Sequence, residues 1–145
     1  MMAVAERLYT PELLGLAVSL ANYPADPNLP FHGSARSRSC GSTLEGDFAL
    51  DAEGRIERIG LRVRACAVGQ AAAAIFAQAA EGRTASEIEA AGDAIGAWLG
   101  EGGEAPTWPG IGALAEARGF AARHGAIMLP WTAARDALSS KSADG

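Results

Sequence analysis

Hydrophobic and polar residues alternate along two neighbouring segments in the first half of the chain. Residues 42–50, "STLEGDFAL", place Leu44 and Phe48 between polar side chains, and residues 56–65, "IERIGLRVRA", do the same with Leu61. A period of two is typical of antiparallel strands that bury one face. The pattern therefore predicts a β-hairpin with one apolar and one polar face.

The sequence between these strands, "DAEG" at residues 51–54, is typical of a tight turn because its glycine tolerates a positive φ. Closing the turn on its first and last residues predicts a register in which Leu44 faces Leu61, so that the apolar faces of the two strands coincide. Continued to the open end of the hairpin, this register brings Cys40 close to Cys66. These are the only two cysteines of the chain.

The pattern changes to a helical period on both sides of this region. We expect a first helix from Thr10, a favourable N-cap followed by a proline. After the hairpin, an alanine-rich helix ends at Gly82, and Thr84 and Glu87 form a capping box that begins the next helix. Further segments are predicted as a linker (about 100–112), a short helix (113–120) and a last helix (129–140) whose first turn contains Pro130. This order predicts an α+β fold.

Length and charge limit the kind of protein. The 145 residues suit a single domain, which we expect to span 1–145 with a disordered tail from about residue 140. The net charge of −5 argues against nucleic acid as a partner, because phosphate binding requires a basic surface. No apolar run is long enough for a membrane span. We therefore expect a cytoplasmic protein whose two cysteines are reduced thiols.

Cys66 is the more informative thiol because it lies where a strand is predicted to pass into a helix. Free N–H groups and the helix dipole at that end, together with the adjacent Arg64, favour the thiolate, the form that binds metals or accepts sulfur. The simpler alternative is a small buried apolar residue. The predicted proximity of Cys40 favours the chemical alternative, since two thiolates supply half of a tetrahedral metal site.

Two histidines and a row of arginines are the remaining candidates for chemistry. His124, predicted just before the last helix, is a third potential metal ligand, although a lone histidine is more often a surface or capping residue. His32, predicted in the loop before the first strand, is a weaker candidate. The third group is a row of three arginines, Arg58, Arg62 and Arg64. We expect it to be a solvated face paired with Glu45 and Asp47, or alternatively a docking face for an acidic partner. No phosphate-binding loop, zinc-protease motif or nucleophile elbow is present, so we expect no enzyme.

Three short motifs in this order resemble the U-type iron–sulfur cluster scaffold family, comprising IscU, SufU and the N-terminal domain of NifU. "SCGS" around Cys40 is similar to the first motif, Ala-Cys-Gly-Asp, and "ACAVGQAAAAIFAQAAEGRT" around Cys66 is similar to the second. "RHGAIMLPW" is similar to the third, Arg-x-Lys-Cys-x-x-Leu-x-Trp. The resemblance covers most of the chain. It implies an N-terminal helix, a three-stranded antiparallel sheet and a helical cap, the SufE/IscU-like fold.

The chain departs from the family at two ligand positions. Ser42 replaces the aspartate of the first motif, and Ala126 replaces the cysteine of the third. The resemblance therefore implies a scaffold that binds iron, zinc or a transient iron–sulfur cluster through Cys40 and Cys66, with His124 or an external thiol completing the ligands. It also implies a cysteine desulfurase and recipient iron–sulfur proteins as partners, and a homodimer sharing one cluster is a further expectation.

Two alternatives remain open at this point. One is a persulfide relay, in which Cys66 or Cys40 accepts sulfur from a desulfurase without holding a cluster. The other is an interaction module that keeps the fold after losing the metal site, as Ser42 and Ala126 suggest.

Overall fold

The computed structural model describes residues 8–38 and 41–144, and the side chains as far as residue 139. It confirms the α+β fold. The helices are α2 (Pro11–Ser19), α3 (Ala67–Ala80), α4 (Ala85–Glu101) and α5 (Ala121–Asp144), with two 3₁₀ helices, η1 (Leu20–Asn22) and η2 (Ile111–Gly119). The strands are β1 (Phe31–Arg36), β2 (Thr43–Leu50) and β3 (Ile56–Arg64).

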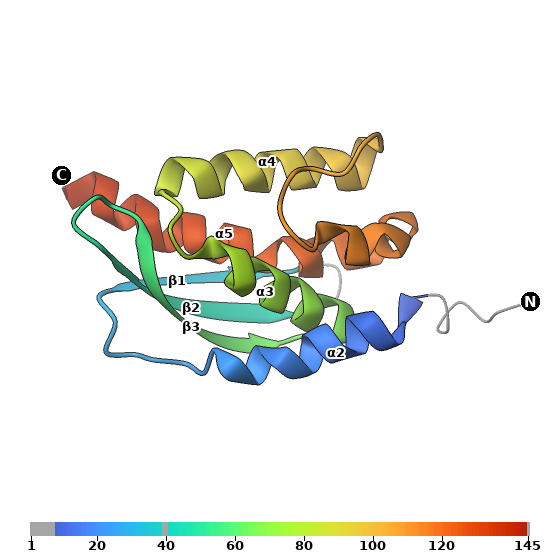
Figure 1. Ribbon diagram of the computed structural model, residues 1–145, viewed down its shortest axis with the longest axis horizontal. Coiled ribbons are helices and arrows are strands. Elements are labelled where there is room, and N and C mark those ends of the chain that lie inside the picture. The colour runs from blue at the N-terminus through green and yellow to red at the C-terminus, as the bar shows by residue number, and fades with distance from the viewer. Residues whose placement is uncertain (1–7, 39–40, 145) are drawn as a thin grey trace, which may run out of the picture.

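The strands form one antiparallel sheet in the order β1-β2-β3. Helices α3 and α5 pack on one face of the sheet, α4 packs on α5, and α2 packs on α3 (Figure 1). The ring of Phe76 lies at the centre of the core, 6.3 Å from Phe48, 5.7 Å from Trp108 and 5.5 Å from Trp131 between centroids. These aromatic contacts tie the sheet, α3 and α5 into one core.

Local sequence determines where several helices begin and end. Thr10 accepts a hydrogen bond from the Leu13 amide at 3.1 Å and so caps α2, as predicted. The capping box of Thr84 and Glu87 is also present and begins α4. Gly82, which follows α3, has a φ of +87°, a conformation that other residues adopt only at a cost.

The predicted hairpin register is wrong by two positions. Leu44 faces Val63 rather than Leu61. A β-bulge at Ala49/Leu50 and a longer loop, in which the Asp51 amide donates to the Arg55 carbonyl at 2.8 Å, together account for the shift. A shift of two keeps each side chain on its predicted face, so the apolar pattern could not detect the error.

The last helix and the first strand both begin earlier than predicted. Helix α5 begins at Ala121, so Pro130 lies in its interior rather than in its first turn, and His124 belongs to the helix. A proline there removes one backbone hydrogen bond, and the burial of the surrounding α5 residues compensates for it. His32 lies within β1 rather than in a preceding loop.

Both outer edges of the sheet have partners. On β1, the Ser34 amide donates to the Asp136 carboxylate of α5 at 3.1 Å. On β3, the Leu61 amide donates to the carbonyl of Tyr23 at 3.0 Å, and Pro24 forms a parallel bridge with Leu61. These contacts satisfy polar groups that an edge strand would otherwise expose.

Among the residues that the structure describes, no helix has the length and apolar character needed to cross a membrane.

Candidate functional site

Cys66 lies at the junction of β3 and α3, as predicted. It is the N-cap residue of α3, with φ −65° and ψ 172°, and its side chain makes no capping hydrogen bond. The thiol is free and partly exposed, and it contacts the edge of the main core. Gln70 fixes the junction because its side chain donates to the Ala65 carbonyl and its amide donates to the Cys66 carbonyl, each at 2.9 Å.

Helix α5 approaches the first turn of α3 very closely. A Cβ atom on Gly69 would lie 2.6 Å from the Cβ of Ala65 and 3.3 Å from the Cβ of Ala126. Only glycine fits between these side chains. The close approach places Ala126 against the helical turn that begins at Cys66.

Ala126 is completely buried and carries no donor atom for a metal. In the motif resemblance described above, it stands in place of the cysteine of the third motif. The part of the candidate site that Ala126 and Gly69 form is therefore apolar. Ser42, which replaces the aspartate of the first motif, is also buried, with 6% of its surface exposed.

Cys40 lies outside the described residues, in the connection between β1 and β2. The ends of that connection are close together, because the Ser37 amide donates to the Ser42 carbonyl at 2.8 Å and the Gly41 amide donates to the Ser37 carbonyl at 2.9 Å. Gly41 has a φ of +71°, which suits glycine in a tight turn.

This connection and Cys66 lie at the same end of the sheet. The last pair of the β2–β3 ladder is Thr43 with Arg64, which is two residues before Cys66. The residues just after Cys40 therefore run beside the residues just before Cys66. The proximity of the two thiols stays a prediction, since no atom of Cys40 is described.

His124 is oriented by a backbone contact with η2. Its Nε2 lies 2.8 Å from the carbonyl oxygen of Arg118, so that nitrogen donates and Nδ1 is left as an acceptor. A metal-binding histidine commonly makes such a contact through its second nitrogen. However, residues two apart on a helix point to opposite sides, so His124 and Ala126 face different directions from α5. The role of His124 as a ligand stays a prediction.

The described residues contain no group of three or more His, Cys, Asp or Glu side chains placed to hold a metal ion. A site on this chain therefore depends on Cys40, or on a ligand from outside the chain.

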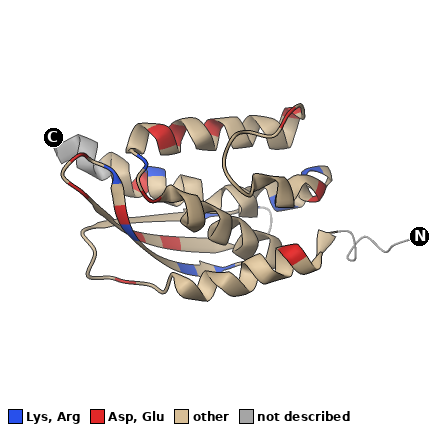
Figure 2. Ribbon diagram, viewed as in Figure 1, with Lys and Arg blue, Asp and Glu red and all other residues tan. Residues whose placement is uncertain are grey.

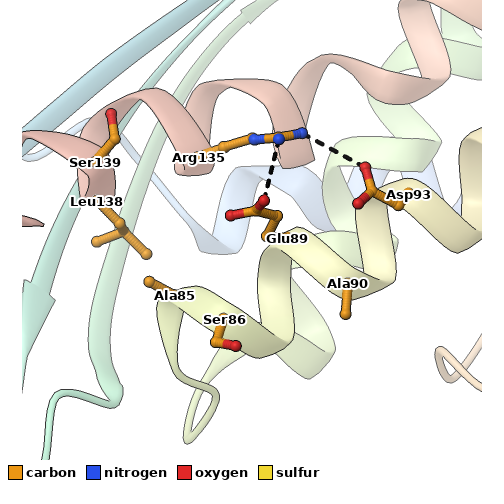
Figure 3. Close-up of a pocket in the computed structure, with 8 residues that line it drawn as sticks. All are labelled: Ala85, Ser86, Glu89, Ala90, Asp93, Arg135, Leu138 and Ser139. Carbon is orange, nitrogen blue, oxygen red and sulfur yellow. Dashed lines mark hydrogen bonds and ion pairs between the residues drawn. The ribbon is translucent and has the colours of Figure 1, made fainter.

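A large hollow among the described residues is remote from Cys66. It has a volume of about 580 Å³ and lies between α4 and α5 (Figure 3). Arg135 of α5 crosses it and binds Glu89 at 3.1 Å and Asp93 at 3.5 Å. With its charged groups paired to one another, this hollow offers no reactive side chain.

His32 belongs to a polar cluster that was not predicted from the sequence. Its Nδ1 lies 2.7 Å from Oδ1 of Asp47, and the other carboxylate oxygen of Asp47 accepts from the Asp26 amide at 3.0 Å. Asp47 was predicted to pair with the arginine row, but Arg58 pairs instead with Asp26, at 3.6 Å. The cluster holds the segment before β1 onto the sheet.

The arrangement defines a class of protein: a small antiparallel sheet with helices on one face, and a partly exposed thiol at its strand-to-helix junction. No protein-family model matches the sequence, and no curated protein matches it either. Solved structures do match.

The N-terminal part of a nitrogen-fixing NifU-like protein from Brucella abortus aligns with a TM-score of 0.89 and 26% identity, covering 99% of this chain and 100% of that one. A protein assigned as the iron–sulfur cluster assembly scaffold of the SUF system in Fervidobacterium islandicum AW-1 aligns with a TM-score of 0.78 and 18% identity, covering 92% and 98%. The chain therefore has the fold of the U-type iron–sulfur scaffold family, and the resemblance drawn from its motifs is confirmed.

Proposed function

We propose that the protein is a scaffold or carrier in iron–sulfur cluster assembly, and that Cys66 and Cys40 are thiolate ligands for its cargo. The observation that carries this proposal is the position of Cys66, a free and partly exposed thiol at a helix N-terminus, in a fold shared with a NifU-like protein and a SUF-system scaffold. Cysteine thiolates are the protein donors that iron and zinc bind.

Two thiolates do not complete the ligands of a cluster, which takes four. A homodimer that shares one cluster between two copies supplies four thiolates. Alternatively, an external thiol such as glutathione supplies what Ala126 lacks, and His124 would add a donor only from another side of α5. A single zinc or iron ion is the simpler cargo for the same donors.

The proposed partners follow from this chemistry. A cysteine desulfurase delivers sulfur, and recipient iron–sulfur proteins take the finished cluster. We propose a carrier rather than an enzyme, in keeping with the scaffold role assigned to the SUF-system protein of the same fold.

Reconstitution with ferrous iron and sulfide under anaerobic conditions tests the proposal. We expect visible absorbance from the wild-type protein, and its loss in Cys66→Ser and in Cys40→Ser, because each variant removes a thiolate ligand. Mass spectrometry under native conditions measures whether the cluster resides in a monomer or a dimer. In the same assay, the absorbance of His124→Gln shows whether His124 is a third ligand.

A wild-type product as colourless as the double-cysteine variant would exclude cluster binding. If the double variant also retained full activity in cells, the protein would be an interaction module that has lost its metal site.

One observation favours a second candidate function, a persulfide relay. A relay requires only one accessible thiol, and Cys66 is free and partly exposed. The described residues contain no group of three potential metal ligands, which a relay would not need. The Cys66 thiolate would attack the outer sulfur of the donor's persulfide. The S–S bond then breaks, the donor leaves as a thiolate, and the transferred sulfur remains on Cys66 as a persulfide. After incubation with a desulfurase, mass spectrometry should find added sulfur on Cys66 and none in Cys66→Ser.

A further inference from the structure

The face of the sheet that points away from α3 and α5 consists of rows of side chains across the strands. One row contains His32, Asp47 and Gly60. The segment before β1 covers this row, because a Cβ atom on Gly60 would lie 2.6 Å from the Asp26 amide nitrogen and 2.8 Å from the Pro24 carbonyl oxygen. The segment before β1 therefore covers the β3 side of this row, while His32 on β1 stays exposed beside a hollow of about 360 Å³.

The opposite end of the face is open and positively charged. Its last row pairs Arg36 of β1 with Thr43 of β2, and Thr43 with Arg64 of β3. Both arginines are exposed, and no carboxylate in the described part of the chain forms an ion pair with either of them. Two strand spacings separate their backbones by about 10 Å, so two guanidinium groups flank one threonine.

The neighbouring row adds to this positive charge. Arg62 lies 3.9 Å from Glu45, and the side chains are 59% and 64% exposed, so the pair is a weak surface contact. A shallow hollow of about 450 Å³ lies among these side chains, lined by Arg36, Thr43, Glu45 and Arg64. Arg38, exposed and just beyond β1, extends the charge toward the β1–β2 connection.

This concentration of positive charge contrasts with the net charge of the whole chain, which is −5. Figure 2 shows basic residues at the ends of β1 and β3 that lie nearest the start of α3, and acidic residues along α4. Arg64 is two residues from Cys66. A molecule that docks on the arginines would therefore be held beside the thiol.

We propose that the open end of the outer sheet face, formed by Arg36, Arg62 and Arg64 around Thr43, docks an acidic segment of a protein partner. The inference rests on the proposed function in one respect: the docked partner is the one that exchanges sulfur or metal at Cys66. Two carboxylates on alternate residues of an extended segment lie about 7 Å apart, so two long and flexible arginine side chains that start about 10 Å apart could each reach one of them. Arginine binds carboxylates through a planar pair of donors, which favours specific docking over loose attraction.

A protein segment fits this surface better than a nucleic acid does. A phosphate backbone gains affinity from many cations placed along its length, whereas Glu45 interrupts the arginines here and α4 is acidic.

The test measures the binding of a fluorescein-labelled peptide of alternating Glu and Ser residues by anisotropy, together with amide shifts in the NMR spectrum of the full chain. We expect shifts at residues 34–36, 43–45 and 62–64, and binding that weakens as salt is raised. Arg36→Glu/Arg64→Glu should lower the affinity by at least about tenfold. Arg36→Gln/Arg64→Gln should show a smaller loss, which separates docking from a folding defect in the charge-reversed variant.

Arg58→Glu is the matched control, since Arg58 is exposed on the same strand and face but at the covered end. It should bind the peptide like the wild type, and so should Cys66→Ser. A peptide with Gln for Glu, and a single-stranded oligonucleotide, should not bind. Equal binding by the wild type and the two double variants, or preferential binding of the oligonucleotide, would overturn the inference. Because Cys66→Ser holds no cargo, this result is independent of cluster reconstitution, and each proposal can fail alone.

Discussion

Ala126 limits what the site can bind, because its side chain is a single methyl group. It is buried against Gly69, in the first turn of the helix that Cys66 begins. The close approach of α5 to α3 means that a side chain at this position faces that turn directly. Restoring a thiol there is therefore an informative change.

We expect Ala126→Cys to increase the iron content after reconstitution and to slow the loss of metal to a chelator, because a third thiolate joins Cys40 and Cys66. Ala126→Ser is the control, since it adds a group of similar size that is a poor ligand for iron and zinc. Equal metal content in the two variants would show that position 126 does not face the cargo.

Glu87 provides a pH-dependent contribution to stability. The Thr84 amide, donating at 3.0 Å, and then the Thr84 hydroxyl at 3.1 Å hold the pKa of Glu87 below its ordinary value of 4.5, and Arg55 and Arg83 add to this effect. A carboxyl with a lowered pKa in the folded state stabilises the protein above its unfolded pKa, and the stabilisation is lost as the pH falls through the folded value.

Glu87→Gln should therefore lower the free energy of unfolding at pH 7, and the difference from the wild type should shrink at about pH 3. Urea unfolding at both values measures this. Glu57→Gln, an exposed change on β3, controls for the loss of one negative charge. A difference that is the same at both pH values would contradict the assignment.

At the scale of elements, β1 and α5 approach each other very closely at Gly33. Gly33 has no room for a side chain, because a Cβ atom there would overlap the Ala133 carbonyl oxygen and lie 2.5 Å from the Ala137 amide nitrogen. Backbone atoms of a long helix cannot move aside cheaply.

Gly33→Ala should therefore destabilise the fold by about 3 kcal/mol or more in chemical denaturation. Gly15→Ala in α2 is the matched control, since nothing lies within 4 Å of its added Cβ atom. That change should stabilise the protein by about 0.5–1 kcal/mol, because alanine favours a helix more than glycine does. Equal effects at the two positions would contradict this account of the packing.

The elements that the sequence predicts best are those with a local cause. The capping residues Thr10 and Thr84 act on amides within their own first turn, so the starts of α2 and α4 follow from a few adjacent residues. The start of α5 does not. Pro130 is typical of a first turn, and only the tertiary burial of the residues around it permits an interior position.

At the scale of the whole molecule, the fold brings distant segments to one end of the sheet. The β1–β2 connection carries Cys40, and the β3–α3 junction carries Cys66. If the thiols are as close as predicted, mild oxidation of dilute protein should form an intramolecular disulfide, which requires Cα atoms within about 7 Å. Mass spectrometry of the monomer should detect the loss of both thiol hydrogens, and Cys40→Ser should abolish it. Cross-linked dimers alone would show that the thiols lie apart.

The site could be predicted from sequence only as far as its topology. Strand alternation and the turn at Gly54 are enough to place Cys66 at the junction, and a register error of two positions leaves that placement intact. The orientation of His124 and the openness of the Arg36 and Arg64 row depend on contacts with segments distant in the sequence. Local patterns contain no information about such contacts.

The occupied edges of the sheet limit how two copies of this chain can meet. With Asp136 on the Ser34 amide and the carbonyl of Tyr23 on the Leu61 amide, an incoming strand finds no free donor at either position. Pairing of two sheets into one continuous ladder is thus disfavoured at those two positions. If two copies share cargo as proposed, an end-to-end approach of their strand-to-helix junctions would avoid both contacts and leave the flanks of the sheet accessible.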